Sequence, residues 1–445
     1  MDSTSAINFF KGHPSFRLLP NDSIIEATKE LLENDKREYD DDPINRHPLT
    51  YGANEGALWV REAICNFNND KIFKFEKGFK GRSTSEALNL TSGASYGVLN
   101  ILLQTTLPHT GYTKQAFIIT PTYFLINDCF IDAGFGNKLT AITEVGGDSI
   151  DLEMLEDKLK YYESIDDSNE DDNQLSIINN PQRIHSKKIY KYVIYLVPTY
   201  SNPSGNTYNL ETRHKLIDLA RRFDMLIITD DVYDMLNYSN YITDSSPLPT
   251  PTKRIVHLDR ETCSKPNSFG NTISNATFSK IIAPGLRFGY HESINEKLSL
   301  QLSNGGANVS GGTPSQLNSM IVGTMLQNGS AEKVLRNLIT TYKERFDKIC
   351  NSITNYMPNG THFNRADGGY FIWMKLPAGF NAHEIGSLAE EEEGVVLANG
   401  SCFEVIGCEK DWGHSCVRLS ISFLEASQIE EGIKLLGKIC ELNIK

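Results

Sequence analysis

The sequence predicts an α/β protein, in which a large domain with a mostly parallel central sheet carries a smaller α+β domain. Two observations support this prediction. From about Leu88 onward, short apolar runs alternate with amphipathic segments, as strands and helices do in a parallel sheet covered by helices. The chain also has 445 residues, which is too long for a single small core, so more than one structural unit is expected.

The first set of elements forms the expected large domain. Each strand is an apolar run too short for a helix, and a helix of period near 3.6 follows it after a polar turn. Strands connected in this way run parallel to each other. We expect strands at residues 88–90, 116–120, 192–197 and 225–229, and helices at residues 96–107, 124–133 and 210–223.

The second set lies near the C-terminus and predicts the smaller domain. We expect strands at residues 370–376, 395–398 and 416–422, and helices near residues 382–392 and 426–442. The chain is therefore divided into an N-terminal segment that contributes to the small domain (residues 1–50), a large domain (residues 51–310), and a linking helix with the C-terminal small domain (residues 311–445).

Two polar stretches interrupt this pattern. Residues 163–188 begin with ESIDDSNEDDNQ and contain too few apolar side chains to order themselves, so we expect a surface insertion. Residues 260–271 are also polar and include Pro266 and Gly270. A solvated loop is the simpler interpretation of each stretch, and a lid over a binding site is the alternative.

Composition excludes several classes of protein. The chain has 43 basic and 56 acidic residues, a net charge of −13, and no long apolar stretch. This argues against nucleic acid as the main partner and against a membrane span. The first residues show neither a signal-peptide nor a transit-peptide pattern, so the cytoplasm is the expected location. The eight cysteines form no CxxC pair and there is no HExxH motif, so no metal site is expected.

The most informative stretch is a strand–helix–strand unit at residues 192–230. Asn202 follows the first strand, Asp230 ends the second strand, and Tyr233 lies three residues further on. Because the two strands are expected to be parallel, both turns emerge at the same edge of the sheet. Open α/β sheets bind ligands at this edge, so Asn202 and Asp230 are expected to converge on one ligand.

A second stretch, LTSGASYGVLNILL, places small residues at the start of a helix. The strand stops at Leu90, and residues 91–95 open the helix. Free backbone N–H groups and the positive end of the helix dipole favour a phosphate there. Ordinary helix capping explains the same pattern, and the stretch alone does not decide between them.

A third stretch, SNATFSKIIAPGLRFGY, contains Lys280 among small and apolar residues and Arg287 seven positions later. An apolar cleft disfavours the ammonium form of lysine and leaves a nucleophilic amine. The Arg287 guanidinium suits a phosphate. In isolation, a solvated lysine and a surface arginine explain the same residues.

Together, these motifs resemble those of a known family. SNPSG, DDVY, SK with a following GLRFG, the early TYGANEGALWVREAI and the late VRLSISF occur in this order. They are similar to those of class I/II pyridoxal-phosphate-dependent aminotransferases of fold type I, and most similar to the branch of aminoadipate and kynurenine aminotransferases. The resemblance spans nearly the whole chain.

The resemblance implies roles for the residues around the cofactor ring. Lys280 is implied to bind pyridoxal 5'-phosphate covalently and to move the proton at the substrate α-carbon. Asp230 is implied to pair with the ring nitrogen, which keeps the ring protonated and electron-withdrawing. Asn202 and Tyr233 are implied to contact the ring hydroxyl oxygen, and Tyr123 to stack on the ring.

The resemblance also implies a phosphate cup and a substrate site. The cup would consist of Ala94, Ser95, Thr277, Ser279 and Arg287, together with Tyr51 from a neighbouring subunit, which implies a homodimer. Arg418 would bind the substrate α-carboxylate with Gly12 beside it, and Asn202 would border the substrate. Arg17 and His13 on the N-terminal segment are the candidates for contact with a second, side-chain carboxylate, with Arg17 the expected partner; a surface role for each is the alternative.

The expected function is transfer of an amino group from an amino acid to a 2-oxo acid by a ping-pong mechanism. The acceptor is expected to be 2-oxoglutarate, and 2-aminoadipate or an aromatic amino acid such as kynurenine is the candidate donor. One alternative is a C–S lyase or a related elimination or cyclisation enzyme on the same scaffold. A remote alternative is a regulatory protein that binds the cofactor without catalysis, but the family-like segment begins at Ile7, which is expected to leave no room for a DNA-binding module.

Overall fold

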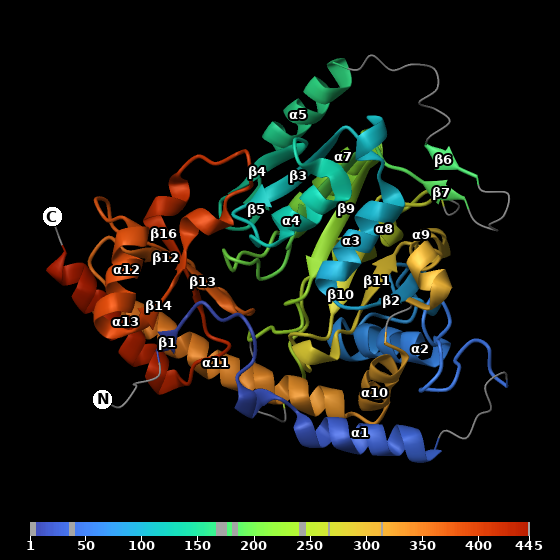
Figure 1. Cartoon of the computed structure of the whole chain (residues 1–445), viewed down its shortest axis with the longest axis horizontal. Helices are drawn as coiled ribbons and strands as arrows, with labels where there is room; N and C mark the ends of the chain where they lie inside the picture. The colour runs from blue at the N-terminus through green and yellow to red at the C-terminus, as the bar shows by residue number, and fades with distance from the viewer. Residues whose placement is uncertain are drawn as a thin grey trace.

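The computed structural model describes residues 6–34, 41–165, 176–179, 186–239, 246–265, 268–312 and 315–443. Figure 1 shows a large body around a central sheet and a smaller body that contains both chain ends. The long helix α11 (Ser330–Tyr356) runs along one side of the molecule and joins the two bodies. Among the described residues, none of the helices combines the length and the apolar character that crossing a bilayer requires.

The central sheet has eight strands and is mostly parallel. In sheet order the strands are β2 (Leu88–Thr91), β11 (Gly289–Ser293), β10 (Thr272–Thr277), β9 (Met225–Asp231), β8 (Tyr192–Leu196), β3 (Gln115–Thr120), β4 (Leu139–Val145) and β5 (Ser149–Ile150). The strands β10, β9, β8, β3 and β4 pair in parallel, while β11 is antiparallel to both β10 and β2, and β5 is antiparallel to β4. The α/β fold expected from the sequence is thus confirmed.

Helices cover this sheet, which explains the apolar runs of its central strands. Every residue of β3, β8 and β9 is buried, as expected for parallel strands covered on both faces. The helix between β8 and β9 begins where the side chain of Asn209 accepts a hydrogen bond from the backbone of Thr212. The helices of the large body are α2 (Leu58–Asn66), α3 (Ala94–Thr105), α4 (Ile126–Phe130), α5 (Leu152–Ser164), α7 (Leu210–Arg222), α8 (Ile255–Thr262), α9 (Glu296–Ser303) and α10 (Gln316–Gln327).

The smaller body is an antiparallel sheet with two helices. The strands lie in the order β12 (His362–Phe363), β13 (Phe371–Lys375), β16 (Cys416–Ser420) and β15 (Ala398–Asn399), beside α12 (Ala382–Glu393) and α13 (Ala426–Leu442). The prediction of one strand at residues 395–398 is wrong. The chain forms two short strands there, because β14 (Val395–Val396) pairs with the N-terminal strand β1 (Ile7–Asn8) while β15 pairs with β16.

The N-terminal segment is held by the smaller body before it reaches the large one. Beyond the β1–β14 pair, the N–H of Phe9 donates to the carbonyl of Val396, and the N–H of Ser420 donates to the carbonyl of Phe9. The helix α1 (Asn21–Asn34) then packs against α10. Residues 10–13 therefore pass between the two bodies, where the sheet edge expected to bind a ligand lies.

The stretch expected to be a surface insertion, residues 163–188, is anchored at both ends. Glu163 lies in the last turn of α5 and accepts a 2.8 Å hydrogen bond from the hydroxyl of Tyr192. At the other end, β7 (Lys187–Lys188) pairs with β6 (Ile177–Ile178), and Nζ of Lys188 lies 2.7 Å from a carboxylate oxygen of Asp224. At the first end Glu163, Ser164 and Ile165 are exposed, and residues 166–175 and 180–185 lie outside the described residues, so the surface insertion stays a prediction.

The second polar stretch, residues 260–271, is held by hydrogen bonds at both ends, while Ser264 and Lys265 between them are exposed. The guanidinium of Arg260 donates to the backbone carbonyls of Gly81 and Arg82 and pairs with buried Glu292. At the other end, the side chain of Asn271 donates to the carbonyls of Ala220 and Met225. Residues 266 and 267 lie outside the described residues.

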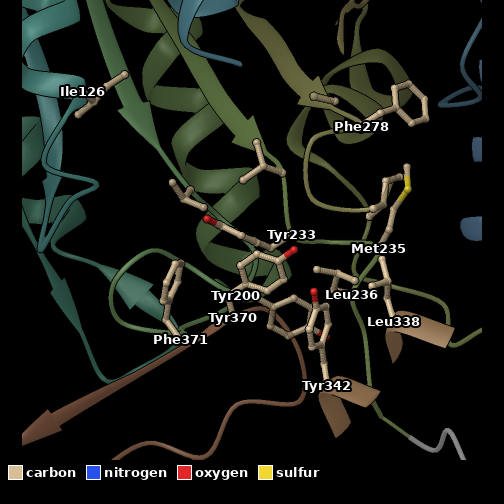
Figure 2. Close-up of a cluster of buried hydrophobic side chains, with 14 of the residues drawn as sticks. Ile126, Tyr200, Tyr233, Met235, Leu236, Phe278, Leu338, Tyr342, Tyr370 and Phe371 are labelled. Atoms are coloured by element: carbon tan, nitrogen blue, oxygen red, sulfur yellow. The ribbon is translucent and has the colours of Figure 1, made fainter. Parts of the chain in front are cut away.

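A cluster of aromatic side chains joins the two bodies beneath the expected site (Figure 2). The ring of Tyr370 lies 5.3 Å from that of Tyr233 and 5.2 Å from that of Tyr342, which is on α11. The hydroxyl of Tyr370 donates a 2.9 Å hydrogen bond to the backbone carbonyl of Lys280. The interface between the bodies therefore fixes the position of the Lys280 backbone.

Candidate active site

A cavity of about 430 Å³ lies at the carboxyl ends of β8, β9 and β10, where residues 10–13 and the strands β13 and β16 close it from the smaller body. This is the edge at which open α/β sheets bind ligands. The cavity brings together most of the residues singled out from the sequence. These are Gly12, Ala94, Ser95, Tyr123, Asn202, Asp230, Tyr233, Thr277, Ser279, Lys280, Arg287 and Arg418.

The charged lining of the cavity is strongly cationic, although the whole chain carries a net charge of −13. Lys11, Lys280, Arg287 and Arg418 line it, and Asp230 is the one carboxylate in the described lining. Such an excess of positive charge in a concave site favours ligands with several negative charges. A ligand with a phosphate, together with one that has a carboxylate, would balance this positive charge.

Lys280 presents an amine suited to attack a carbonyl carbon. Its Nζ donates a 2.9 Å hydrogen bond to the backbone carbonyl of Gly12. The same atom lies 5.6 Å from the ring centroid of Tyr370 and 5.9 Å from that of Tyr233. Burial in this environment lowers the pKa of Lys280 to about 8, although Asp230 opposes the shift. A larger share of the amine is therefore neutral and nucleophilic near neutral pH than in an ordinary lysine.

Asp230, at the end of β9, is buried and held by two donors. The hydroxyl of Tyr195 donates to one carboxylate oxygen at 2.8 Å, and the amide of Asn275 donates to the other at 2.7 Å. Burial raises the pKa of Asp230 to about 6, and both hydrogen bonds oppose that rise. The sequence did not single out Tyr195 or Asn275. Only Asn275 could have been noticed in the sequence, because it is a polar amide within a fully buried strand and lies five residues before Lys280.

The N-terminus of α3 offers the expected phosphate cup. Gly93 precedes the helix with a φ of 93° and no side-chain cap, so the first-turn N–H groups of Ala94 and Ser95 have no capping side chain. Thr277 and Ser279 place their hydroxyl oxygens 2.9 Å apart. The guanidinium of Arg287 donates to the carbonyl of Ser92 at 3.3 Å and to that of Pro284 at 3.0 Å.

Arg418 is a buried guanidinium without an acidic partner among the described residues. It donates to the side-chain oxygen of Asn202 at 3.1 Å and to the carbonyl of Phe10 at 2.6 Å. Its Nε is buried and has no hydrogen-bond partner within the part of the chain that the structure describes, and its carbon centre lies 4.3 Å from the ring centroid of Phe371. Burial lowers the pKa of Arg418 to about 10. A buried cation with an unused donor fits the carboxylate of a ligand.

Two of the residues predicted for the site do not line the cavity. Arg17 is exposed in a short 3-10 helix and does not line the cavity, where a residue that binds a second carboxylate of the substrate would lie. Lys11 is the cation of the same segment that lines the cavity, with its Nζ 4.1 Å from the ring centroid of Phe423. Tyr51 is 71% exposed and lies against Gly311, so its expected contact with a neighbouring subunit stays a prediction.

The residues of this cavity fit pyridoxal 5'-phosphate. The amine matches its aldehyde, the carboxylate matches its ring nitrogen, and the uncapped helix N-terminus matches its phosphate. The guanidinium without an acidic partner in the described part of the chain matches the carboxylate of an amino acid substrate. The family described as aminotransferase class I and II matches residues 7–436. The chain belongs to this family.

Aminotransferases of this class typically bind pyridoxal phosphate and act on amino acids and 2-oxo acids. An uncharacterized protein of Saccharomyces cerevisiae is 60% identical over 436 residues, which cover 98% of this chain and 97% of that protein.

Two solved structures show the same fold. Kynurenine aminotransferase from Pyrococcus horikoshii, solved in complex with PMP, aligns with a TM-score of 0.75 at 24% identity and covers 100% of this chain and 92% of its own. LysN, the α-aminoadipate aminotransferase of Thermus thermophilus, aligns with a TM-score of 0.70 at 22% identity and covers 98% and 92%. The predicted resemblance to this family and its fold type I architecture are confirmed.

Proposed function

We propose that this member of the family is a pyridoxal-phosphate-dependent aminotransferase that passes an amino group from an amino acid to a 2-oxo acid. The observation that carries the proposal is the convergence of three buried or partly buried groups on one cavity: the amine of Lys280, the carboxylate of Asp230 and the unpaired guanidinium of Arg418. These groups supply a nucleophile, a partner for a protonated ring nitrogen and a carboxylate clamp.

The chain's own residues then have the following roles. When bound, pyridoxal phosphate withdraws electron density from the substrate α-carbon, which makes the α-proton removable. Lys280 binds the cofactor and afterwards, as a free amine, takes and returns that proton. Asp230 would accept a hydrogen bond from the ring nitrogen, and Asn202 and Tyr233 would contact the ring hydroxyl.

The remaining contacts orient the cofactor and the substrate. Tyr123 would stack on the ring, and the phosphate would be held by Ala94, Ser95, Thr277, Ser279 and Arg287. Tyr51 of a second subunit completes this cup in a homodimer. Arg418 binds the α-carboxylate beside Gly12, whose position suits a residue without a side chain because a Cβ there would lie 3.0 Å from the ring of Phe371.

For the substrates, we propose 2-oxoglutarate as acceptor and a long acidic or aromatic amino acid, such as 2-aminoadipate or kynurenine, as donor. Phe10 and Phe124 line the cavity with ring centroids 6.1 Å apart and form an apolar wall. Lys11 supports the choice of an acidic acceptor, because it is the lining cation that has no role toward the cofactor or the α-carboxylate. One pocket must accept both side chains in turn during a ping-pong cycle.

A single-turnover experiment tests this function. The protein loaded with pyridoxal phosphate is mixed with each amino acid of a panel, without any 2-oxo acid acceptor, and the visible absorbance and the released 2-oxo acid are followed. An aminotransferase loses its visible absorbance and releases one 2-oxo acid per bound cofactor. Continued release of 2-oxo acid with ammonia would instead identify an elimination enzyme such as a C–S lyase, and no release with any amino acid would favour a binding protein without catalysis.

A further inference from the structure

Three neighbouring strands of the central sheet place polar side chains in one row beneath the cofactor site. Asn275 on β10 is the register partner of Asp230 on β9. On the other side, Tyr195 on β8 is the register partner of Ile228, two residues before Asp230 and therefore on the same face. The carboxylate is thus held from both adjacent strands, with Tyr195 on one oxygen and Asn275 on the other.

The orientation of the Asn275 amide is fixed by its surroundings. Its nitrogen donates to Asp230 at 2.7 Å and to the backbone carbonyl of Ala94 at 3.0 Å, so both N–H bonds are used on acceptors. A flipped amide would place its oxygen against two acceptors. The amide oxygen lies against Gly97, where a Cβ would come within 2.1 Å of it. Asn275 therefore connects Asp230 to the first residue of the helix proposed to bind the phosphate.

The surroundings of Asp230 otherwise disfavour its ionised form. Burial raises its pKa to about 6, and neighbouring Asp231 adds to this effect, while Lys280 and the two hydrogen bonds oppose it. A buried carboxylate that lost these donors would become neutral more readily and would no longer attract a protonated ring nitrogen. The titratable groups that interact with it are Lys280, Asp231, Tyr123, Cys129, Tyr195 and Tyr233.

We infer that Tyr195 and Asn275 are positioning residues that keep the carboxylate of Asp230 ionised and oriented toward the ring nitrogen of the bound cofactor. This inference rests on the proposed function, because it concerns the residue proposed to face the ring. A carboxylate accepts about four hydrogen bonds. The two protein donors use one lone pair on each oxygen and leave the others for the ring N–H.

The test compares two ligands that differ only at the ring nitrogen. Pyridoxal 5'-phosphate and its analogue with C–H in place of that nitrogen share the aldehyde, hydroxyl and phosphate, so their ratio of Kd values isolates the contact with Asp230. Equilibrium dialysis gives both Kd values. Tyr195→Phe and Asn275→Ala should each lower the preference for pyridoxal phosphate roughly tenfold, the effect of losing a hydrogen bond to a charged group. Gly97→Ala, which displaces the Asn275 amide, should act in the same direction.

Controls separate this inference from a general loss of structure and from the proposed function. Tyr208→Phe removes another buried hydroxyl, which donates to Glu144 at 2.6 Å away from the cavity, and should leave the preference unchanged. Equal weakening of both ligands by the Tyr195 and Asn275 variants would overturn the inference. The inference would also be overturned if the Tyr195 and Asn275 variants kept the wild-type ratio of the two Kd values while Asp230→Asn abolished the preference for pyridoxal phosphate. An unchanged preference in Asp230→Asn itself would overturn the proposed role of Asp230, and the inference with it.

Discussion

Nζ of Lys280 donates a 2.9 Å hydrogen bond to the carbonyl oxygen of Gly12, although the two residues are 268 positions apart in the chain. Gly12 lies on the segment that β1 anchors to the smaller body, whereas Lys280 follows β10 of the large sheet. The bond therefore closes the cavity across the two bodies. It also holds the amine in place with an acceptor that a ligand can replace.

The amine of Lys280 should react at a lower pH than an ordinary lysine. Burial lowers its pKa to about 8 from a usual value of 10.5. The neutral fraction of such an amine grows with pH and levels off above the pKa. The rate at which the cofactor-free protein captures pyridoxal 5'-phosphate should therefore rise roughly tenfold per pH unit below pH 8 and then flatten. A rate that still climbs steeply near pH 10 would show an unperturbed lysine.

Arg418→Ala should weaken binding of amino acids and 2-oxo acids by about 2–5 kcal/mol, because it removes one partner of a buried charge pair. Arg418→Lys keeps the charge without the two-pronged geometry and should recover part of this loss. KM and substrate Kd values measure the effect. The matched control is an amine that lacks the α-carboxylate. The wild type and Arg418→Ala should bind this amine with equal Kd values, and a difference would place the carboxylate site elsewhere.

Lys11→Ala should raise the KM for 2-oxoglutarate roughly fivefold and leave the KM for pyruvate nearly unchanged, because only the longer acceptor has a second carboxylate. The modest size reflects an exposed ion pair. Arg17→Ala is the matched control on the same segment, and we expect little change because Arg17 does not line the cavity. Should Arg17→Ala have the larger effect on 2-oxoglutarate, the assignment of Lys11 fails and the expectation from the sequence is restored.

Replacing residues 163–188 by a short Gly/Ser linker should destabilise the protein by about 2 kcal/mol or more, because hydrogen bonds to buried and charged groups are lost at both ends. These are the bonds from Tyr192 to Glu163 and from Lys188 to Asp224. Replacing residues 166–175 alone keeps both anchors and should leave Tm nearly unchanged. Equal Tm values for the two variants would show that these end contacts contribute little to stability.

The parallel sheet and the edge that carries the site could be predicted because they follow from periodicity and from the connection rules of strand–helix–strand units. Asn202 follows β8 and Asp230 lies at the end of neighbouring β9, so their convergence required only that both strands be parallel. The prediction of roles for Lys280 and Arg418 depended on the resemblance of their motifs to those of a known family. Nothing in their local sequence separates them from a solvated lysine and a structural arginine.

Contacts across strands and within loops could not be predicted in this way. The pairing of Asn275 with Asp230 depends on strand register, which the sequence of a fully buried strand does not define. The choice between Lys11 and Arg17 depends on the direction in which an irregular segment presents each side chain. The division of residues 395–398 into two strands depends on the distant strand β1, which pairs with residues 395–396.

The central claim is that Lys280 both carries the cofactor and moves the proton of the amino transfer, and one comparison tests it most directly. Wild type and Lys280→Ala, both loaded with pyridoxal 5'-phosphate, are mixed with an amino acid that reacts with the wild type, and release of 2-oxo acid is measured in a single turnover. Lys280→Ala should still bind the cofactor without a covalent bond, because the phosphate and ring contacts remain, but should release the product at least about a thousandfold more slowly. Product release at the wild-type rate from the loaded Lys280→Ala protein would contradict the account.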